Sequence, residues 1–148
     1  MIDFTSKLTL RTSASNQLQG VVKEIKSSST KVEVTISLYA DIEIVVVITN
    51  RSLKDLDIQE GSQLYVLLKS SWISLYKTLP TELKEKNRLQ GLLSNIEQDE
   101  ENCEVTIDLS EQNTLISSLS NSEFQSLNLK KNDTLWAVFD TSSALLAV

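Results

Sequence analysis

Residues 31–38 read Lys-Val-Glu-Val-Thr-Ile-Ser-Leu, and residues 102–109 read Asn-Cys-Glu-Val-Thr-Ile-Asp-Leu. Every second residue in both stretches is apolar, which is the period of a β-strand with one buried face. The two stretches are 71 residues apart (102 − 31), and the same offset aligns residues 16–20 with residues 87–91. The alignment continues without a gap through the rest of each copy. A gapless match of this length indicates a tandem duplication of one small β-rich domain.

The duplication predicts the division of the chain. We expect a first domain over residues 1–75 with a lead-in at 1–11, a linker at 76–86 and a second domain over residues 87–148. The linker contains Pro80, the only proline of the chain, among polar residues that favour a loop. Domains of about 60 to 65 residues bury little surface and are marginal alone. Pairing of the two copies, or formation of an oligomer, is therefore expected.

The expected elements of one copy are short strands interrupted by a helix. A second strand follows at residues 41–49, and its apolar run Val-Val-Val-Ile indicates burial on both faces. A capping-box spacing predicts helices that open at Ser52 and at Ser122. Gly61 marks a turn, which Asn132-Asp133 replaces in the second copy, and further strands are expected at 63–69 and 134–140. The predicted fold is all-β: two tandem five-stranded OB-like Greek-key barrels, each with one short helix.

Composition excludes several classes of function. The chain has no histidine, a single cysteine, and no nucleophile elbow, Gly-rich phosphate loop or cluster of metal ligands, so an enzyme or a metal site is not expected. A net charge of −6 and sparse aromatic residues disfavour a nucleic-acid partner. No apolar run reaches the roughly 20 residues that span a membrane, and the N-terminus does not resemble a signal peptide. The cytoplasm is the expected compartment.

Several conspicuous side chains are interpreted as structural. Cys103 replaces Val32 on an apolar strand face, so it is expected to be a buried small hydrophobe. The acidic run at residues 99–101 is expected to be a solvated hairpin tip, because no calcium-loop spacing surrounds it. Trp72 and Trp136 are expected to pack in a core or an interface.

Two short motifs show what the first copy resembles. Residues 12–18 read Thr-Ser-Ala-Ser-Asn-Gln-Leu and precede Gly20, and residues 69–72 read Lys-Ser-Ser-Trp. With Val-Ile-Thr-Asn at 47–50, these stretches resemble the molybdate-binding Mop family, whose modules are also called TOBE domains. Modules of this family occur in pairs in small cytoplasmic molbindins and in the ligand domain of a molybdate-dependent transcriptional regulator. The resemblance covers the whole chain, strongly in the first copy and faintly in the second.

The resemblance implies a binding site for molybdate or tungstate, with no catalytic cofactor. Such tetrahedral dianions require converging N–H and O–H donors and one or two fixed cations. By this resemblance, the Ser13 hydroxyl and the Ala14 amide are donors, Lys69 supplies charge, and Ser70 supplies a further donor. The family places the anion between subunits, which implies a homo-oligomer, a dimer or a trimer. The implied role is molybdenum storage, homeostasis or sensing.

One departure from the family pattern leaves an alternative open. Ser15 stands where the family has arginine, so the site loses a bidentate, permanently charged partner and Lys69 carries the charge, unless Arg11 or Lys86 contributes. In the second copy, Asp140 stands at the position of Lys69, and this copy is interpreted as a structural partner. The alternative function is a degenerate interaction or regulatory module that has lost oxyanion binding.

Overall fold

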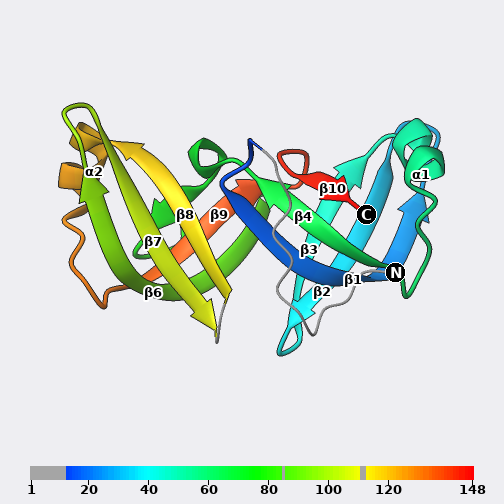
Figure 1. Cartoon of the computed structure of the whole chain (residues 1–148), viewed down its shortest axis with the longest axis horizontal. Helices are drawn as coiled ribbons and strands as arrows, with labels where there is room; N and C mark the ends of the chain where they lie inside the picture. The colour runs from blue at the N-terminus through cyan, green and yellow to red at the C-terminus, as the bar shows by residue number, and fades with distance from the viewer. Residues whose placement is uncertain (1–12, 85, 111–112) are drawn as a thin grey trace. The chain divides into compact units, whose positions relative to one another are not determined.

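The computed structural model of the protein describes residues 13–84, 86–110 and 113–148, and it contains two compact units (Figure 1). Unit 1 comprises Met1–Leu68 and Thr141–Val148, and unit 2 comprises Lys69–Asp140. Each unit has a five-stranded antiparallel sheet and one seven-residue α-helix. The predicted all-β fold of two five-stranded units is confirmed.

In unit 1 the sheet has the strand order β10-β4-β1-β2-β3. The helix α1 lies between β3 and β4 in the chain, so it interrupts the strands as predicted. The elements are β1 (Asn16–Ser27), β2 (Val32–Tyr39), β3 (Ile42–Ile48), α1 (Asn50–Leu56), β4 (Gln63–Leu68) and β10 (Leu145–Ala147).

In unit 2 the order β5-β9-β6-β7-β8 repeats the same arrangement. A short 3₁₀ helix, η1, precedes β5. The elements are η1 (Ser70–Trp72), β5 (Ser74–Tyr76), β6 (Lys86–Gln98), β7 (Asn102–Ser110), β8 (Asn113–Ser120), α2 (Asn121–Leu127) and β9 (Thr134–Asp140).

The two copies of the repeat exchange their last strands. The strand β5 follows the first copy in sequence but pairs with β9, whereas β10 ends the second copy but pairs with β4. Figure 1 shows β10 beside β4. The compact units therefore differ from the divisions expected at 1–75, 76–86 and 87–148, which follow the sequence repeat. A three-residue strand carries the same local signal whichever sheet it joins, so the repeat pattern alone does not reveal the exchange.

Each exchanged segment also connects the two edges of its sheet. In unit 1 the Val47 amide on β3 donates to the carbonyl of Thr141, just before β10, over 2.8 Å. In unit 2 the buried Ser117 hydroxyl on β8 donates to the carbonyl of Ile73, just before β5, over 2.7 Å. A sheet whose two edges are connected in this way has the closed arrangement of a small barrel.

The core of each unit comes from the alternating face that the sequence predicted. Val32, Val34 and Ile36 are fully buried in unit 1, and Cys103 is fully buried at the matching position in unit 2. The prediction that Cys103 is a buried small hydrophobe is confirmed. Burial raises the pKa of its thiol, because the interior disfavours the thiolate. A buried neutral thiol is a poor nucleophile.

The first strand of each copy is bent at the same place and lies close to the next strand at a glycine. The register of β1 shifts between Val22 and Glu24, and that of β6 shifts between Leu93 and Asn95. A Cβ added at Gly20 would lie 2.4 Å from the Ile36 Cγ2, and a Cβ added at Gly91 would lie 2.4 Å from the Asp108 carbonyl oxygen. Both glycines therefore allow an approach that a larger residue would block.

Both helices begin earlier than predicted. Thr49 caps α1, and its Oγ1 accepts from the Ser52 amide at 3.0 Å; Ser120 caps α2 in a complete capping box with Glu123. The expected starts at Ser52 and Ser122 were wrong. An N-cap residue needs extended backbone, and the end of the preceding strand already provides it. Thr49 directly follows β3 and has ψ of 160°, and Ser120 is the last residue of β8 and has ψ of 156°.

Two predicted turns are confirmed. Gly61 has φ of +90°, and Asn132, which replaces it in the second copy, has φ of +75°.

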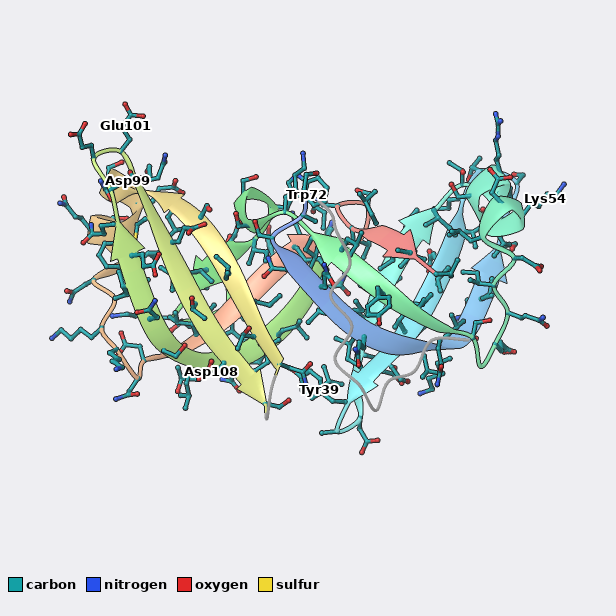
Figure 2. All side chains as sticks on the ribbon, viewed as in Figure 1. Tyr39, Lys54, Trp72, Asp99, Glu101 and Asp108 are labelled. Carbon is teal, nitrogen blue, oxygen red and sulfur yellow. The ribbon has the colours of Figure 1, made fainter. Side chains whose placement is uncertain are left out.

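Figure 2 shows Asp99 and Glu101 at the tip of the hairpin between β6 and β7. The Asp99 carboxylate accepts from the amides of Asn102 and Glu101, and these hydrogen bonds lower its pKa. The acidic run is a hydrogen-bonded, exposed hairpin tip, as expected.

Candidate functional site

The opening motif of the candidate site lies in unit 1, directly before β1. Ser13 and Ser15 are exposed and Ala14 is half-buried. Asn16 begins the strand, is only 3% exposed, and pairs in register with Leu68 of β4. The hydroxyls of Ser13 and Ser15 thus reach solvent at the end of a strand whose next residue is fixed in the sheet. Thr12 and the alternative cation Arg11 lie outside the described residues.

The closing motif lies at the start of unit 2 and folds around η1. The Trp72 amide donates to the Lys69 carbonyl over 3.0 Å, which forms the short helical turn. This turn brings the Lys69 ammonium to 5.6 Å from the centre of the Trp72 ring, and Trp72 is labelled in Figure 2. A cation at this distance over an indole ring is attracted by its negative face. Lys69 is exposed, so its ammonium remains accessible to an anion.

A serine that sequence reasoning missed contacts the closing motif. The Ser70 hydroxyl is 2.7 Å from the Ser118 hydroxyl on β8, a hydrogen bond in which either oxygen can donate. The neighbouring Ser117 holds the Ile73 carbonyl, so β8 contacts both sides of the turn that carries Trp72. The available signal was the adjacent serine pair within a strand that is otherwise apolar on one face. The second copy therefore positions part of the first copy's motif.

The five expected residues fall into two groups in different compact units. Ser13, Ala14 and Ser15 belong to unit 1, whereas Lys69 and Ser70 belong to unit 2. Within unit 2 the structure brings Lys69 and Ser70 together with Trp72 and Ser118. In the chain, Ser15 directly precedes the Asn16–Leu68 register pair and Lys69 directly follows it.

In the second copy the corresponding residues neutralise each other. Lys86 aligns with Ser15 and Asp140 aligns with Lys69, and these two residues pair in register between β6 and β9. Their side chains form an ion pair. An added oxyanion would have to compete with the Asp140 carboxylate for the Lys86 ammonium. The idea that Lys86 supplies a charge to the first copy's site is therefore disfavoured.

The described parts of the chain show neither a metal-binding cluster nor a membrane-spanning helix. Histidine, cysteine, aspartate and glutamate do not gather there in groups of three that could hold a metal ion. In the same residues, no helix is long and apolar enough to cross a membrane. The expected site residues themselves offer hydroxyl, amide and ammonium groups, which are donors suited to an oxyanion.

Comparison with known proteins assigns the family. The model of the TOBE domain matches the sequence twice, over residues 12–75 and 85–146. The chain belongs to the TOBE domain family. The two matches coincide with the two sequence copies, and each ends within the strand that pairs with the other copy's sheet. The resemblance to Mop modules is confirmed at the level of the family.

Two relatives match almost the whole length of the chain. The molybdenum transport protein ModE of Azotobacter vinelandii is 31% identical over 141 residues, covering 95% of this chain and 52% of that protein. The molybdenum-pterin-binding protein MopA of Rhodobacter capsulatus is 26% identical over 142 residues, covering 95% of this chain and 54% of that protein. The chain thus spans about half the length of the curated relatives it matches.

A solved structure matches over nearly the full length of both chains. ModG, a cytoplasmic molybdate-binding protein crystallised with molybdate bound, superposes with a TM-score of 0.89 at 27% identity. The match covers 94% of this chain and 99% of the ModG chain. The fold of the chain is therefore similar to that of ModG over nearly its whole length.

Proposed function

We propose that this tandem TOBE protein binds molybdate or tungstate without catalysing a reaction, through Ser13, Ala14, Ser15, Lys69 and Ser70. The observation that carries the proposal is the closing motif of the first copy, where the ammonium of the exposed Lys69 lies 5.6 Å from the Trp72 ring and the next residue, Ser70, has its hydroxyl hydrogen-bonded to Ser118. The likeness to ModG, whose structure contains molybdate, supports the same ligand here.

The chemistry of these groups suits a tetrahedral dianion. Lys69 supplies a full positive charge, and hydrogen bonds from charged donors are about twice as strong as neutral ones. Ser13, Ser15 and Ser70 supply hydroxyl donors, which add directed bonds but no charge. Because the chain has a net charge of −6, the local positive field must come from these few residues. We expect one oxyanion per chain, since the Lys86–Asp140 ion pair neutralises the second copy.

An oligomer follows from the same proposal. Mop modules place the anion between subunits, so we expect residues from two chains to complete one site in a homodimer or homotrimer. An anion held between subunits gains charge from both of them. The role is storage, homeostasis or sensing of molybdenum in the cytoplasm, the compartment of ModG.

Calorimetry with three anions tests the proposal. We expect saturable heat with molybdate and with tungstate, and a melting temperature that rises with ligand concentration. Sulfate, which is smaller, is the matched control and should bind more weakly. A native-mass measurement of the same sample gives the number of chains and of bound anions. Silence towards both large anions at millimolar concentration would refute the proposal.

The replacement at Ser15 favours a second candidate function, a TOBE interaction or regulatory module that no longer binds oxyanions. Loss of the family's arginine removes a bidentate partner. The variant Ser15→Arg separates the two functions. If the natural protein binds molybdate, the variant should bind it about tenfold more tightly, as expected for an added charged hydrogen bond. If only the variant binds, the second function is the better description.

A further inference from the structure

An open pocket lies in unit 1 at the C-terminal end of α1, separate from the motifs described above. Its volume is about 410 Å³. It is lined by the residues that end α1, by the turn at Gly61 and by Val148, which directly follows β10. All of these residues belong to unit 1.

The polar groups of this pocket include several acceptors. Asp57 terminates α1 in the left-handed conformation, where the last carbonyl groups of a helix carry a partial negative charge. Its own carboxylate forms no ion pair with any residue that the structure describes. Gln63 also lines the pocket, and its Oε1 is buried without a hydrogen-bond donor among the described residues. The pocket therefore favours a cation or a hydrogen-bond donor.

Unit 2 has the same local structure at the equivalent place. Asn128 ends α2 with φ of 49°, close to the 51° of Asp57. In unit 1 the Gln59 amide donates to the Ser62 hydroxyl over 2.9 Å, and in unit 2 the Lys130 amide donates to the Asp133 carboxylate over 2.8 Å. The helix end and the following turn therefore correspond residue for residue at the repeat offset of 71.

The strand that borders the pocket also has the same register in both units. Leu145 of β10 pairs with Leu67, and Ser74 of β5 pairs with Val138, each partner being displaced by 71 residues (145 − 74 and 138 − 67). Val148 and Lys77 directly follow these strands, at the same offset (148 − 77). Val148 therefore holds in unit 1 the place that Lys77 holds in unit 2.

Unit 2 occupies this place with its own ammonium group. The Lys77 Nζ donates to the Asn128 carbonyl over 2.8 Å and lies 3.7 Å from the Asp133 carboxylate. Unit 1 also has one carboxylate here, but at a different position of the repeat. Asp57 replaces Asn128, and Ser62 replaces Asp133. Unit 1 thus keeps the acceptors and the carboxylate of an ammonium site but has valine where the lysine would be.

We propose that the unit 1 pocket binds a primary alkylammonium group, such as the end of a lysine side chain. The Asp57 carbonyl accepts from the ammonium, as the Asn128 carbonyl does from Lys77, and the Asp57 carboxylate supplies the negative charge that Asp133 supplies in unit 2. Leu56, Ile58 and Val148 line the same pocket and contact the methylene stem. This site uses none of the oxyanion-binding residues, so it is independent of the proposed function.

Titration with n-butylammonium chloride, followed by amide NMR spectra of the full chain, tests the site. Saturable shifts are expected for amides between residues 57 and 63. The matched amides between residues 128 and 134 should not respond, because Lys77 already fills that place. The controls are sodium chloride at equal ionic strength and n-butanol, which has similar shape without charge. Unsaturated shifts, or equal shifts with n-butanol, would overturn the proposal.

Three variants test the site at exposed positions, and two of them install the residue of the other unit. Asp57→Asn installs the residue found at 128 and should weaken n-butylammonium binding about tenfold. Val148→Lys should fill the pocket and abolish the shifts, whereas Lys77→Ala should make unit 2 respond. Unchanged binding by Asp57→Asn would contradict the assignment.

The source of the ammonium group is distinguished by a second ligand. The blocked peptide acetyl-Gly-Lys-Gly-amide carries a single ammonium group, on the lysine side chain, within a protein-like backbone. Tighter binding of the peptide than of n-butylammonium identifies a lysine of a partner protein as the source, and tighter binding of n-butylammonium identifies a free amine. Failure of both ligands to bind overturns the proposal.

Discussion

The segment that begins at Lys69 and the segment that begins at Asp140 are the same part of the repeat, yet they carry opposite charges. Lys69 directly follows β4, and Asp140 is the last residue of β9. The strand that comes next pairs in identical register in both units, and both segments help to connect the edges of a sheet. The backbone pairing and the buried face thus determine the fold, whereas exposed side chains at strand ends are free to diverge in function.

The largest expected effect concerns these exposed ends. Lys69→Ala removes the only full positive charge among the proposed oxyanion ligands and should weaken molybdate binding about 100-fold, the upper range for a charged hydrogen bond. The matched variant Asp140→Ala changes the second copy at the aligned position and should not weaken binding. Calorimetry measures both affinities, and denaturant unfolding checks that stability is retained. Equal affinities of natural protein and Lys69→Ala would reject Lys69 as a ligand.

The glycines at the bend of the first strands come next. Gly91→Ala places a Cβ against the Asp108 backbone, which cannot rotate away, and should destabilise the protein by about 2 kcal/mol. Gly20→Ala first meets the movable Ile36 side chain, so its cost should be about 1 kcal/mol. Urea unfolding gives both values. A larger effect at Gly20 would show that the two strand pairs do not share the same close approach.

The contacts of the Lys77 ammonium group in unit 2 should have a smaller effect on stability. Lys77→Met keeps the aliphatic stem but removes the hydrogen bond to the Asn128 carbonyl, so unfolding should become easier by about 0.5 to 1 kcal/mol. Val148→Lys should raise the stability by a similar amount, because it supplies unit 1 with the same ammonium group. Thermal unfolding at low and high salt measures both variants, and salt should reduce each effect.

Cys103→Val, which installs the residue of the first copy, should change the stability least, by less than about 0.5 kcal/mol at neutral pH. Burial raises the thiol pKa above its ordinary value of 9.0, so the natural residue favours the folded state fully below that value. This contribution is lost as the pH rises, because only the unfolded chain ionises readily. The valine variant should therefore gain stability relative to the natural protein in alkaline urea titrations. Parallel pH profiles would contradict a buried thiol.

The sequence was sufficient for those features that local patterns encode. The alternation around Val34 and Val105 predicted both buried faces, and Gly61 predicted a turn with positive φ. The helix starts were misplaced because Ser52 and Ser122 also have a capping spacing, and only the ends of β3 and β8 decide between the candidates. Local signals therefore fix the type of element more firmly than its first residue.

Long-range features were not predictable from local patterns. The exchange of β5 and β10 depends on which sheet each three-residue strand reaches, and nothing in residues 74–76 specifies that choice. The contact between Ser70 and Ser118 likewise joins residues that are far apart in sequence. For the candidate site, family resemblance supplied the five expected residues, and the structure added Trp72 and Ser118 as groups that position two of them.

The exchanged strands also affect the order in which the protein can fold during synthesis. Unit 2 is one continuous stretch, Lys69–Asp140, so its strands are synthesised one directly after another. Unit 1 lacks β10 until residues 141–148 have been made, after the whole of unit 2. The pairing of β10 with β4 closes a long loop, and such long-range contacts form late. Until β10 has been made, one edge of β4 in the nascent chain therefore has no partner strand. The later half of the chain is therefore able to complete its sheet before the earlier half.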